Sequence, residues 1–205
     1  MAEALGVHFQ DRPEVYVSDN LFLYYEQGNP RAVVAPDVLV VIGADKHDRR
    51  SYLLWQEPKA PDFVLEITSN STRSEDQGVK RGLYAYLGIR EYWQYDPTGD
   101  YLTPPLQGLF LEGENYRRIS ADVSAGGVLA LHSKVLGLEL RLENGELRFY
   151  DPKGSNLLTH GESELARHLA EEQARRGKTA REAAEARLAE LEKRLQALQS
   201  RTGNN

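Results

Sequence analysis

The stretch APDFVLEITSNSTRSEDQGVKRGLYAYLGIREYWQYDP, residues 60–97, decides the fold. It contains two apolar segments, 63–68 and 91–95, on either side of a segment with helical periodicity. Strand, helix and strand in this order form a βαβ unit, so the two strands are predicted to be parallel.

The helix between them has start and stop signals. Two capping boxes precede it, formed by Thr72 with Glu75 and by Ser74 with Gln77. Gly88 is placed to end it. Its predicted apolar face consists of Val79, Leu83, Tyr86 and Leu87.

Glu66 stands in the middle of the first apolar strand, where burying an unpaired carboxylate would cost several kcal/mol. Asp62 shares its side of the strand but lies roughly 13 Å away, at about 3.3 Å per residue. Asp37 opens another apolar strand, 38–42, which is expected beside 63–68. Two carboxylates directed at one point are stable with a shared proton or with a hard cation such as Mg²⁺ or Mn²⁺.

A lysine on the helix can reach these carboxylates. Asp76, Lys80 and Tyr84 follow one another at a spacing of four, and helical phasing places Lys80 at the border of the apolar stripe. Its ammonium would balance the charge of a metal site, or orient a water and stabilise charge that develops on a phosphate. Lone strand carboxylates are also common partners of structural arginines, and Asp76 with Lys80 could form a surface ion pair. The residues alone leave these interpretations open.

The composition of the 205 residues, 40% hydrophobic and 27% charged, is typical of a globular protein. Because the chain has no cysteine, disulfides and thiolate metal sites are excluded. The sequence contains neither an apolar run long enough to span a membrane nor a leader segment, so no membrane partner and a cytoplasmic location are expected. The net charge of −6 argues against nucleic-acid binding, unless acids gather at a metal site with basic residues around it. The basic residues expected there are Lys46, His47, Arg49, Arg50, Arg73 and Arg81.

The later part of the chain predicts a hairpin and then a long helix. Strands 138–142 and 147–149 flank an Asn144-Gly145 turn, and the aromatic residues Trp55, Trp93 and Tyr95 are expected in the core. We expect one domain over 1–160, a charged helix over 161–200 and a disordered tail over 201–205. A seam at Ala184, Leu188, Leu191, Leu195 and Leu198 is compatible with either a short coiled coil or a solvated single helix.

Several of these features together resemble a known family. They are Asp37 after Pro36, the stretch PDFVLEITSNSTRSED, the later Lys80, Tyr84 and Gly88, and EYWQYDP. This pattern resembles the Uma-type family of bacterial endonucleases, in the PD-(D/E)XK or restriction-endonuclease-like superfamily, over roughly residues 20–160. The resemblance implies an α/β fold with a mixed sheet and flanking helices, whose N-terminal helical region is short or missing in this chain.

The resemblance also implies a site and a reaction. Asp37 and Glu66 match the two acids of the motif and, with the backbone carbonyl of Ile67, would hold Mg²⁺ or Mn²⁺. Thr68 stands where the motif has lysine, and the displaced lysine would be Lys80. Asp37, Glu66 and Lys80 are then the expected catalytic residues of a metal-dependent endonuclease that hydrolyses DNA phosphodiester bonds. The alternative is a catalytically inactive nuclease-fold protein that acts as an interaction or assembly module, with a homo-oligomer formed through its C-terminal helix.

Overall fold

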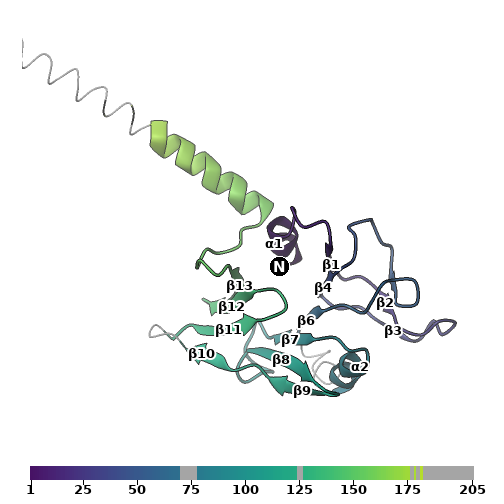
Figure 1. Ribbon diagram of the computed structural model, residues 1–205. Coiled ribbons are helices and arrows are strands. Elements are labelled where there is room, and N and C mark those ends of the chain that lie inside the picture. The colour runs from purple at the N-terminus through teal and green to yellow at the C-terminus, as the bar shows by residue number, and fades with distance from the viewer. Residues whose placement is uncertain (70–77, 124–126, 176–177, 179–180, 182–205) are drawn as a thin grey trace, which may run out of the picture. The chain divides into compact units, whose positions relative to one another are not determined.

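The computed structural model describes residues 1–69, 78–123, 127–175, 178 and 181 (Figure 1). The chain divides into two compact units, Met1–Thr159 and His160–Asn205. The described part of the first unit contains a six-stranded sheet, a four-stranded sheet, a three-stranded sheet and two short helices. In the second unit, residues 160–175 form a helix.

The six-stranded sheet has the order β1-β4-β6-β7-β8-β9. Strands β6 and β7 are parallel and the other neighbours are antiparallel, which confirms both the predicted parallel pair and the predicted position of β4 beside β6. The strands are β1 (Val15–Asp19), β4 (Val38–Ile42), β6 (Phe63–Ile67), β7 (Glu91–Tyr95), β8 (Leu106–Glu112) and β9 (Asn115–Arg118).

Both faces of this sheet are covered, which explains why its central strands read as continuous apolar runs. Side chains alternate between the faces, so Val64 and Tyr92 belong to one hydrophobic cluster while Leu65 and Trp93 belong to the other. The face with Trp93 packs against helix α1 (Ala2–His8) and the four-stranded sheet. That sheet consists of β10 (Ala121–Val123), β11 (Leu129–Ser133), β12 (Leu138–Glu143) and β13 (Glu146–Tyr150).

The face with Tyr92 packs against helix α2 (Lys80–Tyr86) and the small three-stranded sheet. Tyr84 of α2 contacts Tyr92 edge-to-face, with ring centroids 5.1 Å apart. Helix α2 lies near β9 (Figure 1). The small sheet has the order β3-β2-β5, with β2 (Leu23–Tyr24), β3 (Val33–Val34) and β5 (Tyr52–Leu53).

A buried carboxylate, Glu91, connects the two larger sheets. It is fully buried at the start of β7, and its oxygens accept four hydrogen bonds from uncharged donors. The donors are the Trp93 indole N–H (3.0 Å), the Ser133 hydroxyl (2.5 Å) and the backbone N–H groups of Lys134 (2.8 Å) and Val135 (3.1 Å). Glu91 therefore fixes the β11–β12 connection against the central sheet.

The predicted hairpin over 138–149 is confirmed. Strands β12 and β13 are paired from Glu139 with Tyr150 to Glu143 with Glu146. Asn144 and Gly145 have φ values of 52° and 83°, the left-handed pair that a two-residue turn of type I′ requires.

Two expectations about packing were wrong. Val79 and Tyr86 are 73% and 85% exposed, whereas Tyr84, which was left out of the predicted apolar face, is fully buried. The tyrosine faces inward because its hydroxyl has a partner on the sheet, as described below. Trp55 is 37% exposed at the end of the small sheet, although Trp93 and Tyr95 are core residues as expected.

Other predictions fall outside the described residues. These are the capping boxes at 72–77, Arg73, Asp76 and the seam residues from Ala184 to Leu198.

Candidate active site

Asp37 and Glu66 are brought together at one end of the β4–β6 pair. The antiparallel register pairs Val38 with Leu65, so each carboxylate lies one residue beyond this pair on its own strand. Oδ2 of Asp37 accepts a hydrogen bond of 2.6 Å from the backbone N–H of Ile67, the residue after Glu66. The Asp37 side chain thus takes a backbone donor on β6, and this bond fixes its carboxylate next to Glu66.

Helix α2 supplies the partners of Glu66. The Tyr84 hydroxyl donates to Oε1 at 2.6 Å, and Nζ of Lys80 lies 2.9 Å from Oε2. Residues four apart share a helix face, so Lys80 and Tyr84 reach the same carboxylate from successive turns. Glu66 is 2% exposed and the Lys80 side chain 14% exposed, so water screens this ion pair little. Sequence reasoning gave Tyr84 no role, although its spacing of four from Lys80 was the signal that could have assigned one.

A different buried carboxylate, that of Asp62, lies at the opposite end of β6. Asp62 is 1% exposed and accepts a hydrogen bond from the Ile42 backbone N–H at 2.8 Å. It also contacts Nζ of Lys59 at 2.6 Å and the Arg90 guanidinium at 2.9 and 2.8 Å. Asp62 is thus the partner of a structural arginine and takes no part in the Asp37–Glu66 site.

The two ends of the strand differ in charge. At one end, Glu66 is paired with the ammonium of Lys80 and Asp37 accepts from a backbone N–H, so two carboxylates lie on adjacent strands. At the other end, the single carboxylate of Asp62 lies against the cations of Lys59 and Arg90. Two neighbouring carboxylates attract a further cation, whereas the two cations beside Asp62 repel one.

The donor set at the Asp37–Glu66 end suits a hard cation. Carboxylate and carbonyl oxygens are the ligands that Mg²⁺ takes, and Mg²⁺ commonly binds through one or two carboxylates while keeping several waters. No group of three or more His, Cys, Asp or Glu residues that could hold a metal ion is present among the described residues. The Thr68 hydroxyl, two residues after Glu66, is buried without a hydrogen-bond partner, and an ordered water would satisfy it. The residues present thus fit a partly hydrated Mg²⁺ ion.

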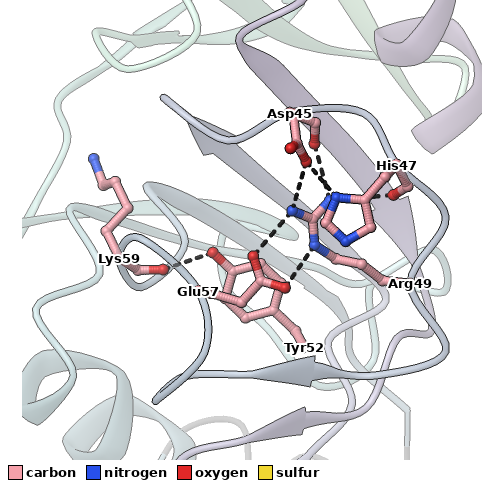
Figure 2. Close-up of polar contacts among 6 residues, drawn as sticks. All are labelled: Asp45, His47, Arg49, Tyr52, Glu57 and Lys59. Atoms are coloured by element: carbon pink, nitrogen blue, oxygen red, sulfur yellow. Dashed lines mark hydrogen bonds and ion pairs between the residues drawn. The ribbon is translucent and has the colours of Figure 1, made fainter.

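Arg49 was expected near the site as a basic residue, and the structure places it in a closed cluster instead (Figure 2). Its side chain is 3% exposed and forms a two-pronged ion pair with Glu57 at 2.7 and 2.9 Å. It also bonds Asp45 and lies over the Tyr16 ring, 4.3 Å from the centroid. Hydrogen bonds to Glu57 raise the pKa of Arg49 above its ordinary value, against the effect of burial. Arg49 therefore stabilises the fold and is not available to a substrate.

Lys46 is engaged in the same way. Its Nζ donates to the backbone carbonyls of Phe9 at 2.6 Å and Gln10 at 3.0 Å, so it ties the end of α1 to the loop after β4. Arg81, on α2, differs because its side chain is exposed and donates one hydrogen bond of 3.2 Å to the Tyr116 carbonyl.

The mixed sheet with its flanking helices defines a chain of the restriction-endonuclease-like α/β class. The chain belongs to the Uma2 family, described as "Putative restriction endonuclease", which matches residues 1–143 and confirms the resemblance seen in the sequence. A solved structure described as a putative nuclease belonging to DUF820 from Anabaena variabilis shares 13% identity, over 66% of this chain and 68% of that chain, with a TM-score of 0.44. A search of the curated proteins finds no match. In the described part of the chain, every helix is too short or too polar to cross a membrane.

Proposed function

We propose that the protein is a Mg²⁺- or Mn²⁺-dependent endonuclease that hydrolyses DNA phosphodiester bonds at the Asp37–Glu66–Lys80 site. One observation carries this proposal. Two carboxylates far apart in the sequence meet at one strand end, and the lysine of the following helix lies 2.9 Å from one of them.

The protein's own groups have separate tasks in this reaction. Asp37, Glu66 and the Ile67 carbonyl would hold the divalent ion, which when bound neutralises the negative charge of the attacked phosphate. Lys80 keeps its ammonium beside Glu66, from where it orients the attacking water and stabilises the charge that develops on the phosphate oxygens. Tyr84 is a positioning residue: its hydroxyl holds Oε1 of Glu66, so the carboxylate is fixed before substrate arrives.

The test is cleavage of supercoiled plasmid DNA by the full-length protein with Mg²⁺, Mn²⁺ or EDTA. Glu66→Gln and Asp37→Asn keep the side-chain shape and remove the charge that holds the ion. We expect each to lower the cleavage rate by at least about 100-fold. Glu146→Gln, an exposed position in the β12–β13 hairpin, is the matched control and should cleave like wild type.

Calorimetric titration with Mn²⁺ gives a readout that does not depend on cleavage. Wild type should bind Mn²⁺ with a millimolar or tighter constant, and Asp37→Asn should bind it much more weakly. Cleavage that survives in Glu66→Gln, purified in parallel, would show that the site is assigned wrongly.

A second candidate function is assembly through the C-terminal helix. In the described part of this helix, Leu165 and Leu169 are 61% and 51% exposed at a spacing of four. We propose that they belong to a homo-oligomeric contact, which sedimentation of the full chain and of a chain lacking 163–205 would test. An inactive nuclease-fold module would show oligomers that depend on 163–205, together with no Mn²⁺ binding and no cleavage.

A further inference from the structure

A polar pocket lies on the same face of the central sheet as Glu66. It has a volume of about 330 Å³ and is formed by α2, β7, β8, β9 and the segment between β7 and β8. Its polar lining consists of Arg81, Gln94, Tyr101, Thr103, Gln107 and Arg118. Sequence reasoning missed it, because these residues come from five separate parts of the chain.

The charge of this pocket is opposite to that of the protein. Of the described residues that line it, two carry a guanidinium and none a carboxylate, although the chain has a net charge of −6. Arg117, the neighbour of Arg118 on β9, is paired with Glu112, whereas Arg118 has no carboxylate partner among the residues that the structure describes. An unpaired guanidinium in a polar pocket is suited to bind a phosphate through two N–H groups.

The pocket is aligned with the candidate active site across the sheet. Glu66 is in register with Gln94 on β7, and Gln94 is in register with Gln107 on β8. Paired residues point to the same face, and neighbouring strands are about 4.8 Å apart, so the pocket is centred roughly 5–10 Å from Glu66 along the sheet. One strand of DNA rises about 3.4 Å per nucleotide, so this separation corresponds to no more than about three nucleotides.

Helix α2 connects the two places through adjacent residues. Successive residues of a helix are about 100° apart, so Lys80 reaches Glu66 while Arg81 turns toward the pocket. The hydrogen bond of Arg81 to the Tyr116 carbonyl holds its guanidinium between α2 and β9. Gln94, which also lines the pocket, is 4% exposed; its amide nitrogen donates one hydrogen bond of 3.3 Å to the Tyr92 hydroxyl and has a second N–H for an oxygen ligand.

We infer that this pocket binds an uncleaved phosphate of the DNA strand, within about three nucleotides of the phosphate that lies at Glu66. Arg118 and Arg81 contact the phosphate oxygens, and Gln94, in register with Glu66, lies on the side of the pocket nearest the active site. The inference rests on the proposed endonuclease function. It gives the acidic protein a local cationic surface where the substrate strand must pass.

The experiment measures binding of a fluorescent DNA duplex to the full-length protein in EDTA, so that binding is read without cleavage. Affinity is followed by anisotropy between about 50 and 200 mM salt. Each lost phosphate contact lowers the log–log salt slope by about 0.9. Wild type should therefore lose about threefold more affinity over this range than Arg118→Ala. Arg117→Ala removes the same charge from the adjacent, carboxylate-paired position and should keep the wild-type slope.

The outcomes separate the pocket from the catalytic site. If Arg118→Ala keeps the wild-type slope, or if Arg117→Ala flattens it equally, the pocket is not a strand-phosphate site. Calorimetry with inorganic phosphate tests whether the pocket binds a free phosphate ion instead of a DNA phosphate. If phosphate binding depends on Arg118 but duplex binding does not, the inference is also overturned. Loss of cleavage in Glu66→Gln with an unchanged Arg118→Ala slope refutes the pocket alone. Retained cleavage in Glu66→Gln with a flattened Arg118→Ala slope refutes the catalytic assignment alone.

Discussion

Replacing Lys80 by methionine tests how Glu66 is stabilised. Methionine keeps most of the apolar stem and removes the ammonium that lies 2.9 Å from Oε2. Glu66 would remain 2% exposed with the Tyr84 hydroxyl as its remaining side-chain donor from α2. Breaking a buried ion pair by removing one partner costs about 3–5 kcal/mol. Because Lys80 is partly exposed and Tyr84 remains, we expect Lys80→Met to lower the free energy of unfolding by about 3 kcal/mol in EDTA.

The matched control is Lys59→Met, which removes an ammonium 2.6 Å from a buried carboxylate, that of Asp62. Here the lysine is 42% exposed, and Asp62 keeps Arg90 and the Ile42 N–H. The cost should stay below about 1 kcal/mol. Urea unfolding followed by circular dichroism measures both variants against wild type.

Divalent metal should partly reverse the effect of Lys80→Met. For a site with a millimolar dissociation constant, about 10 mM Mg²⁺ raises the free energy of unfolding by about 1.4 kcal/mol. The rise should be larger in Lys80→Met than in wild type, because no ammonium then competes for Glu66. The reasoning is refuted if Lys80→Met unfolds within about 0.5 kcal/mol of wild type in EDTA, or if Lys59→Met costs as much.

Three further predictions concern the surrounding fold. Glu91→Gln should lower the free energy of unfolding, measured in urea, by about 2–4 kcal/mol, because the NH₂ group of glutamine cannot accept the hydrogen bonds that one carboxylate oxygen accepts. An unchanged free energy of unfolding would contradict the structural role of Glu91. Gly108→Ala places a Cβ 2.8 Å from the Trp93 ring and should cost about 1–3 kcal/mol in the same assay, while an unchanged midpoint would mean that the ring can move. Burial of Asp96 opposes its ionisation, but backbone N–H groups and the Thr98 hydroxyl lower its pKa from 3.8 to about 2. Its contribution to stability is thus present above about pH 4 and is lost as the pH falls toward 2, so Asp96→Asn should weaken the acid dependence of unfolding in that window.

The central strands could be predicted because their signals are local. The runs at Val38–Ile42, Phe63–Ile67 and Glu91–Tyr95 are largely apolar on both faces, and the segment between the last two is long enough for the helical crossover that usually joins parallel strands. The proximity of Asp37 to Glu66 then followed from strand order. The reach of Lys80 followed from helical phase.

The remaining features depend on tertiary contacts that leave little trace in the sequence. The burial of the Tyr84 side chain was missed because hydrophobicity alone does not rank it above Val79 and Tyr86 as a core residue. The deciding factor is its hydrogen bond to Glu66. Arg49 looked like a surface cation, and only the fold brings Glu57 and the Tyr16 ring around it. Charge type can be read from a sequence, but burial of that charge depends on distant segments.

The buried carboxylate of Glu91 limits how far this chain can be shortened, because two of its four donors are backbone groups after β11. Its donors include backbone groups of Lys134 and Val135, which follow Glu91 by 43 and 44 positions in the chain. A fragment that ends soon after β9 would contain Asp37, Glu66 and Lys80 but would leave Glu91 without those donors in the core. The candidate active site and the four-stranded sheet should therefore unfold in one cooperative transition, and an excised central sheet must extend at least through Val135 to keep all the donors of Glu91.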